Sequence, residues 1–191
     1  MARQRDYSKM NTIYDATLDL ITKKGFSGLK MAEVADASGI AIGTIYIYFK
    51  DKDDLINHLY AHLKRQKAIV FSEVIPDEIS YETALRNQWM KYFDTNLADT
   101  ETGIFMEQYY HSSLLKNTNA EDAQKFLKPV FALFDRGKKE GIIKNSANEI
   151  LFSMLTGPVH ELIRLHQTGV LKISEEKKKN LFQLIWSGIK A

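Results

Sequence analysis

Cysteine is absent from this chain of 191 residues. Its absence excludes disulfide bonds, cysteine zinc sites and thiol catalysis, and it is typical of proteins kept in a reducing compartment. No apolar run approaches the roughly 18 residues needed to span a bilayer. The first residues, MARQRDYSKM, also lack the apolar centre of a secretory signal. We therefore expect a cytoplasmic protein.

Proline is scarce, and its three residues stand at positions 76, 129 and 158. Several long segments lack both proline and glycine, and their apolar residues recur every three or four positions, which is the spacing of amphipathic helices. No run of alternating apolar and polar residues indicates a strand. Hydrophobic residues make up 45% of the chain, which is enough for a core. The predicted fold class is all-α.

An excess of one charge is also lacking, since the formal net charge at pH 7 is +2. Residues 1–70 carry 11 Lys and Arg against 8 Asp and Glu, whereas residues 71–191 carry 15 against 16. A mildly basic beginning on a neutral remainder suits a protein that touches phosphates at one end.

Glycines and capping residues divide the first part of the chain into short helical segments. The apolar spacing predicts helices over 7–24, 31–37, 42–48 and 52–71. Gly25 ends the first helix in the manner of a C-cap. Gly39 provides the tight turn between the second and third, because glycine adopts a left-handed backbone at no steric cost. Asp51 is placed to cap the fourth helix, and Asp53 and Asp54 lie in its first turn, near the positive end of its dipole.

Longer helices are predicted for the rest of the chain, over 80–98, 104–115, 120–140, 147–167 and 175–189. Pro129 and Pro158 lie inside two of them and are expected to kink or split them. Ser174 is placed to cap the last helix. In total we expect about nine helices.

Two short helices joined by a glycine turn and braced by an earlier helix form the pattern of a helix-turn-helix. The second short helix is narrow enough to enter the major groove of DNA, while the first lies across the backbone. The pattern therefore predicts a DNA-binding head.

The residues of this head resemble those of the tetracycline-repressor (TetR) family over about 45 positions. The resemblance rests on Gly25-Phe26, on Met31-Ala32-Glu33-Val34-Ala35, and on the run Gly39-Ile40-Ala41-Ile42-Gly43-Thr44-Ile45-Tyr46-Ile47-Tyr48-Phe49-Lys50-Asp51-Lys52-Asp53-Asp54-Leu55. The most specific part is Gly-Thr-Ile-Tyr followed by Tyr-Phe-Lys. The resemblance implies a helix-turn-helix head with a larger helical ligand-binding and dimerisation body, and we place the domains at residues 1–51 and 52–191.

The resemblance also implies which residues of the head bind DNA. They are Ile42, Gly43, Thr44, Tyr46, Tyr48 and Lys52. In the family, the tyrosine matching Tyr46 donates its hydroxyl to a phosphate, the lysine matching Lys52 holds another, and Gly43 lets the helix approach the groove closely. Ile42 departs from the polar or basic residue common in the family and can offer only apolar contact, for example with a thymine methyl group. Lys30 and Ala41 stand where a capping Ser or Thr is usual, and Arg3 and Arg5 can compensate as an arm near phosphates or the minor groove.

Aromatic and methionine side chains are dense in the middle of the chain. An apolar cavity edged by a few polar groups is the usual build of a small-molecule site. The candidate ligand-binding residues are Trp89, Tyr92, Phe93, Phe105, Met106, Tyr109, Tyr110, Phe131, Phe134 and His160. The alternative is that these residues only fill the core, since aromatic residues dominate protein cores in any case.

The last two predicted helices carry broad apolar faces. In the resembling family these helices pair with those of a second copy, which predicts a homodimer. The candidate interface residues are Leu155, Val159, Leu162, Ile163, Leu181, Ile185 and Trp186. Packing inside one chain is the alternative for these residues.

No phosphate-binding glycine loop, nucleophile elbow or paired-carboxylate pattern is present, so we expect no enzymatic activity and no cofactor. His58 and His62 lie four apart, as Glu107 and His111 do, but a zinc site needs further ligands, and we expect no metal. The predicted function is a repressor that a small, largely apolar effector releases from operator DNA. A protein-interaction module and a metal-sensing regulator are the alternatives.

Overall fold

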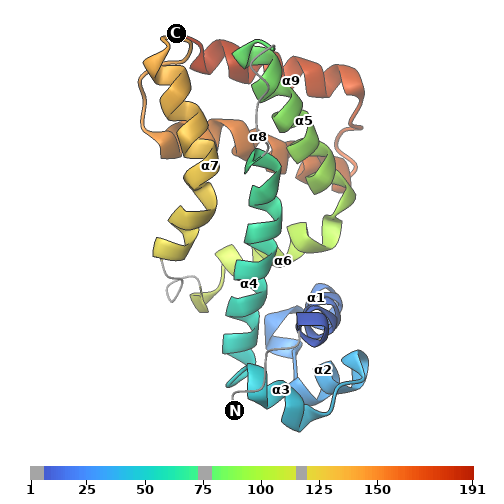
Figure 1. Ribbon diagram of the computed structural model, residues 1–191. Helices are drawn as coiled ribbons and strands as arrows, with labels where there is room; N and C mark the ends of the chain where they lie inside the picture. Colours follow the sequence, from blue (N-terminus) through green and yellow to red (C-terminus); the bar gives the residue numbers. More distant parts are fainter. Residues whose placement is uncertain (1–6, 73–78, 115–119) are drawn as a thin grey trace. The chain divides into compact units, whose positions relative to one another are not determined.

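The computed structural model describes residues 7–72, 79–114 and 120–191. These residues form nine α-helices and one short 3-10 helix, with a single isolated bridge between Ile143 and Lys190 in place of any strand (Figure 1). The prediction of an all-α fold is confirmed. Among the described residues, no helix is both long enough and apolar enough to cross a membrane.

The first three helices follow the predicted segments closely. They are α1 (Tyr7–Gly28), α2 (Met31–Ser38) and α3 (Ile42–Tyr48). Gly25 has a left-handed φ of 72° inside α1, so the regular helix ends where the sequence predicts and one further turn follows it. That interruption is tolerated because glycine alone adopts this backbone without strain.

The fourth helix, α4 (Lys52–Ala68), is capped by its flanking carboxylates. The Asp54 backbone N–H donates to the Asp51 Oδ1 at 2.8 Å, and the Lys50 N–H donates to the Asp54 Oδ2 at 2.9 Å. The two bonds satisfy backbone donors at a helix start that no helical carbonyl can reach. A 3-10 helix, η1 (Ile69–Ser72), takes the place of the last turn that the sequence predicts.

The remaining helices are α5 (Tyr81–Ala98), α6 (Thr100–Tyr110), α7 (Ala120–Lys139), α8 (Asn148–Gln167) and α9 (Glu175–Ile189). Pro129 and Pro158 lie inside α7 and α8, and neither divides its helix. Ser174 caps α9 as predicted, because its hydroxyl accepts the Lys177 N–H at 3.3 Å.

The chain divides into two compact units. The N-terminal unit comprises residues 1–64 and 100–119, and the C-terminal unit comprises residues 65–99 and 120–191. Helix α4 passes from one unit into the other at Lys64 and Arg65. Helix α6 belongs to the N-terminal unit, where it packs against α1.

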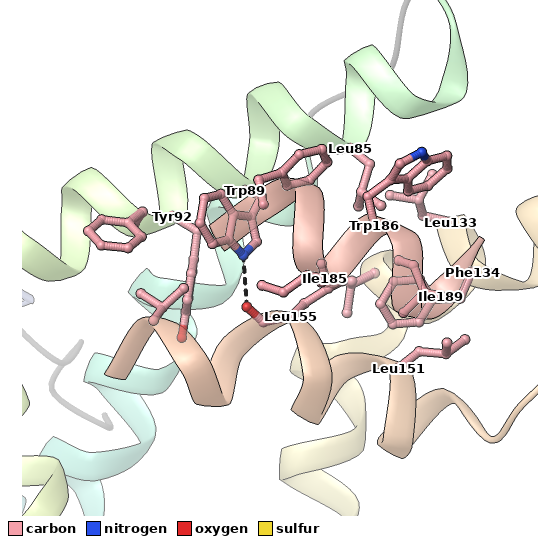
Figure 2. Packing of buried hydrophobic residues seen from close by; sticks show 14 of the residues in the cluster. Leu85, Trp89, Tyr92, Leu133, Phe134, Leu151, Leu155, Ile185, Trp186 and Ile189 are labelled. Carbon is pink, nitrogen blue, oxygen red and sulfur yellow. Dashed lines mark hydrogen bonds between the residues drawn. The ribbon is translucent and has the colours of Figure 1, made fainter. Parts of the chain in front are cut away.

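The core of the C-terminal unit is built by α5, α7, α8 and α9. Figure 2 shows the indole of Trp89 on α5 beside Leu155 of α8, and its Nε1 donates to the Leu155 carbonyl oxygen at 2.8 Å. This bond satisfies the one polar group of a fully buried side chain, so both core packing and a hydrogen bond fix the orientation of Trp89.

A buried lysine ties α9 to α5 in the same unit. The side chain of Lys178 is 8% exposed, and its Nζ donates to Asp94 at 2.5 Å and to Glu175 at 2.6 Å. Burial alone would lower the pKa of Lys178, but the two carboxylates outweigh it, and the pKa is raised. The ammonium is therefore held charged at a place where an unpaired charge would be costly.

Most of the residues predicted to form the dimer interface lie inside this core. The buried ones are Leu155, Val159, Ile163, Ile185 and Trp186, while Leu162 and Leu181 are half-buried. Helical spacing identifies an apolar face but not what covers it, and here the same chain covers most of it.

Candidate nucleic-acid interface

The turn between α2 and α3 is set by Gly39. This residue has a left-handed φ of 65°, and its N–H donates to the Asp36 carbonyl at 3.4 Å while the Ile40 N–H donates to Ala35 at 3.2 Å. A Cβ at Gly39 would meet nothing within 4 Å, so the backbone conformation, not crowding, requires glycine here.

Helix α3 is too short to be stable alone and is held by its buried side. Ile45 is fully buried and Phe49, directly after the helix, is 1% exposed. No side chain caps its start at Ala41, whereas the Thr44 N–H reaches the Ala41 carbonyl at 2.8 Å. The core of the unit therefore fixes which side of α3 faces outward.

The outward side of α3 is apolar and aromatic. Ile42 is 43% exposed, Tyr46 50% and Ile47 69%, and a Cβ at Gly43 would meet nothing within 4 Å. Ile42 and Tyr46 are four residues apart, as Gly43 and Ile47 are, so the four share one face. Exposed apolar side chains gathered on one short helix are typical of a surface that contacts another molecule.

Three of the predicted DNA-binding residues stand on this face, namely Ile42, Gly43 and Tyr46. Thr44 and Tyr48 are half-buried, at the margin between the outward face and the core. Ile47 also lies on this face, although the family motif leaves its position variable. The signal that identifies it is the helical spacing from Gly43.

The predicted phosphate-binding lysine, Lys52, is half-buried at the start of α4. Its Nζ donates to the Phe26 carbonyl at 3.2 Å, near the end of α1. That bond uses one of the three N–H donors of an ammonium group. Lys52 therefore links α4 to α1 in the described structure, and it has donors left for a phosphate. Arg3 and Arg5 lie outside the described residues.

Acidic groups near α3 are largely engaged within the protein. Glu33 pairs with Lys24 at 3.1 Å, and Asp51 and Asp54 cap α4. Two exposed lysines flank the pair of helices, Lys30 just before α2 and Lys50 just after α3.

A shallow, open depression of about 450 Å³ lies between α2 and α3. It is lined by Ala32, Ala35, Asp36, Gly39, Ile40, Ala41 and Ile42.

The residues predicted to bind a ligand fall into both units. Phe105, Met106, Tyr109 and Tyr110 lie on α6 in the N-terminal unit. Tyr109 is buried, its ring stacks on Tyr60 at 3.9 Å, and its hydroxyl donates to the Asn57 Oδ1 at 2.7 Å. Burial raises the pKa of Tyr109 to about 12, which keeps this hydroxyl a donor. These contacts bind α6 to α4.

The other predicted ligand residues belong to the C-terminal unit. They are Trp89, Tyr92, Phe93, Phe131, Phe134 and His160. Trp89, Phe93 and Phe134 are fully buried in the core. The Tyr92 hydroxyl and the Nε2 of His160 on α8 are 2.9 Å apart, so the buried Tyr92 has a polar partner.

A buried ammonium lies in the electrostatic range of this pair. Burial, and then the charge of Lys67, lower the pKa of His160, which keeps its ring neutral at pH 7. The Lys67 Nζ is 3.0 Å from the Asp99 carboxylate, yet it makes no hydrogen bond to any described residue. Helical spacing does not single out Lys67, since a lysine near the end of an amphipathic helix is usually solvated.

Metal ligands do not gather in the described residues, where no group of three or more His, Asp or Glu side chains could hold an ion. His58 is engaged instead with the Asp54 carbonyl, at 2.9 Å from its Nδ1, and with the Asp54 carboxylate at 3.3 Å.

Together, the braced α2–α3 pair, its outward recognition face and the helical remainder define a helix-turn-helix DNA-binding protein. Residues 13–59 match the model of the family described as bacterial regulatory proteins, tetR family, and residues 80–190 match that of the tetracyclin repressor-like C-terminal domain. The chain belongs to the TetR family of transcriptional regulators, as the sequence predicts.

Similar proteins include the fatty acid metabolism regulator protein of Bacillus subtilis, which is 26% identical over 163 residues and 81% of each chain. A TetR family transcription regulator from Marinobacter aquaeolei has the same fold, with a TM-score of 0.83, 25% identity and coverage of 98% of both chains. FadR of Bacillus subtilis, whose structure holds stearoyl-CoA, has a TM-score of 0.78 at 22% identity, over 96% of this chain and 100% of its own.

Proposed function

We propose that this protein is a homodimeric repressor that binds a palindromic operator and leaves it when a small, largely apolar effector binds. Residues 1–51 form the DNA-binding domain and residues 52–191 the ligand-binding and dimerisation domain. The observation that carries the proposal is the outward face of α3, which displays Ile42, Gly43 and Tyr46 on a helix anchored by buried Ile45.

In the proposed complex, α3 enters the major groove and its outward face meets the base edges. The exposed Tyr46 hydroxyl and the remaining donors of Lys52 hold phosphates on either side. Thr44 and Tyr48, at the margin of the face, contact the backbone near the groove edge. Arg3 and Arg5 add phosphate or minor-groove contacts from the N-terminal arm. The protein acts in the cytoplasm, where a bacterial operator lies.

A dimer is supported by the apolar residues that α8 and α9 leave exposed. Ile150 is 56% exposed, Met154 38% and Leu184 65%. Met154 lies against α9, because a Cβ at Gly188 would come within 2.9 Å of its Cε. The exposed stripes of the two helices are thus adjacent, and the half-buried Leu162 and Leu181 extend them. Two-fold pairing gives two heads that can read half-sites roughly 34–36 Å apart.

The effector we propose is a long apolar chain with an anionic group, the chemistry of a long-chain acyl-CoA. The similar fatty acid metabolism regulator and the stearoyl-CoA held by FadR support this choice. In this chain, the aromatic side chains of the C-terminal unit would face the apolar part. Lys67, whose buried ammonium pairs with Asp99 but donates no hydrogen bond to a described residue, and the Tyr92–His160 pair would face the anionic part.

Release from DNA follows from the position of Lys67 on α4, the helix shared by both units. An effector that binds one position of the C-terminal end of α4 more tightly than another stabilises that position. Because α4 is one helix, its start at Lys52 then moves with it. Such coupling is typically about 1–3 kcal/mol and is reciprocal, so operator DNA weakens effector binding by the same factor.

The experiment that tests DNA binding is selection from a pool of randomised duplexes. The wild-type protein is expected to enrich a palindrome, and Tyr46→Ala is expected to lose it. Ile104→Ala is the control, because it trims an exposed side chain of the same unit outside α3. If a folded dimer enriches no sequence, the repressor proposal is wrong and the protein-interaction alternative gains. Stearoyl-CoA added to the selected complex then tests release.

A further inference from the structure

The seven residues of α3, Ile-Gly-Thr-Ile-Tyr-Ile-Tyr, include no Arg, Lys, Asn, Gln, Asp or Glu. Those are the side chains that discriminate base pairs by paired or directional hydrogen bonds in the major groove. A recognition helix without them has to obtain its sequence preference in another way.

The hydroxyl groups of α3 do not replace these side chains. A hydroxyl both donates and accepts, so it bonds to either kind of base edge and discriminates little. Thr44 and Tyr48 are half-buried, and only Tyr46 holds its hydroxyl on the outward face. We propose that this hydroxyl binds a phosphate, so it is not available to read a base.

Carbon atoms make up the rest of the outward face. Ile42 and Ile47 are 43% and 69% exposed, and Gly43 between them leaves open space. The one apolar group that a base pair presents in the major groove is the C5 methyl of thymine. Contact between an isoleucine and this methyl removes apolar surface from water on both sides, and an unmethylated base in its place forfeits that gain.

The charged groups around α3 are placed for phosphates or for helix capping, except for Asp36, which is exposed on α2 and not on the outward face of α3. The exposed lysines, Lys30 and Lys50, lie just before α2 and just after α3, where an ammonium meets phosphates. Asp51 and Asp54 are used in capping α4. On α3 itself, the side chains left to discriminate between bases are Ile42 and Ile47.

We propose that the head reads thymine C5 methyl groups through Ile42 and Ile47, so that each operator half-site carries thymine beneath these two side chains. The proposal rests on the proposed operator binding and names the chemical feature of the operator that is recognised. It makes Ile47 a specificity-determining residue beside Ile42.

The test replaces thymine by deoxyuridine in the selected operator, which removes the methyl and keeps every hydrogen-bonding group. One symmetric pair of thymines is replaced at a time, and the Kd of the wild-type protein is measured. Loss of a buried methyl corresponds to about a fourfold change in affinity, so a symmetric pair is expected to cost about 15-fold at the contacted positions. Pairs outside the contact are expected to change the Kd less than twofold.

Isoleucine variants assign the effect to its side chain. Ile42→Ala and Ile47→Ala are each expected to abolish the deoxyuridine effect at one pair of positions, while Ile104→Ala keeps all of them. Melting temperatures confirm that the variants fold.

Two outcomes overturn different statements. A specific operator whose Kd ignores deoxyuridine at every thymine refutes methyl recognition and leaves the repressor intact. Deoxyuridine effects that persist in both isoleucine variants refute the assignment to Ile42 and Ile47. A pool that yields no operator refutes the repressor proposal itself and methyl recognition with it.

Discussion

Replacing Gly43 by alanine separates the stability of the head from its function. The residue lies in the first turn of α3 with no left-handed φ, and its Cβ would meet nothing within 4 Å. Alanine is favoured over glycine in a helix by about 0.5–1 kcal/mol, so we expect Gly43→Ala to unfold at slightly higher urea concentration than the wild type. Within the chain, the substitution costs nothing.

DNA binding is expected to change in the opposite direction. Gly43 lies between Ile42 and Ile47 on the face that we propose to meet the groove, where a methyl group would hold the helix away from the bases. Overpacking of a tight contact costs about 1–3 kcal/mol, which for two heads raises the Kd by about 30-fold or more. Fluorescence anisotropy with the selected duplex measures this change.

Gly103→Ala is the matched control. Gly103 lies on α6 of the same unit, is exposed, and has nothing within 4 Å of an added Cβ. We expect it to gain similar stability and to keep the wild-type Kd. A Gly43→Ala protein that binds the operator as tightly as the control would refute close approach of α3 to the groove.

Three further predictions concern the C-terminal unit. Lys178→Met should lower the free energy of unfolding at pH 8. Because the folded pKa of Lys178 is raised, its contribution to stability is complete below the ordinary lysine pKa and is lost as the pH rises through the folded pKa. The free energy of unfolding should therefore change less with pH above pH 10 in the variant than in the wild type. Gly137→Ala should destabilise the protein by about 1–3 kcal/mol in urea, because the new Cβ would lie 2.6 Å from the Tyr81 ring and the side chain or helix must shift; unchanged stability would contradict this contact. The folded pKa of His160 is lowered, so its contribution to stability is present above the unfolded pKa of about 6.5 and is lost as the pH falls below that value. His160→Gln should reduce the loss of unfolding free energy between pH 7 and 5. An equal loss in the variant and the wild type would refute the role of His160.

Local rules predicted the elements of the fold. Gly39 marks a turn because the backbone there requires a left-handed residue, and Asp51 marks a helix start because its side chain accepts a backbone N–H. The helices of the described residues, including the positions of α2 and α3, followed from such signals, whereas the family followed from the resemblance of the motif around Gly43–Leu55. The 3-10 turn after Ala68 did not, since no cap or breaker in the sequence announces it.

Which element covers which face could not be predicted. Aromatic density makes Phe105 and Tyr109 candidates for either a pocket or the core, and the structure places both in the core of the N-terminal unit, where α6 packs with α1 and α4. Leu155 and Trp186 lie on apolar faces that their own unit covers. Lys67 became a candidate only through its buried surroundings, because helical spacing gives the periodicity of a face and not its partner.

Operator binding is tested most directly by the affinity for the selected duplex as a function of salt. If two heads hold phosphates with groups such as Lys52, the logarithm of the binding constant falls linearly with the logarithm of salt concentration, by about 0.9 for each phosphate contacted. We predict this steep decline together with a preference over a scrambled duplex of about a thousandfold or more. A binding constant that does not change with salt, or one equal for both duplexes, would contradict the account.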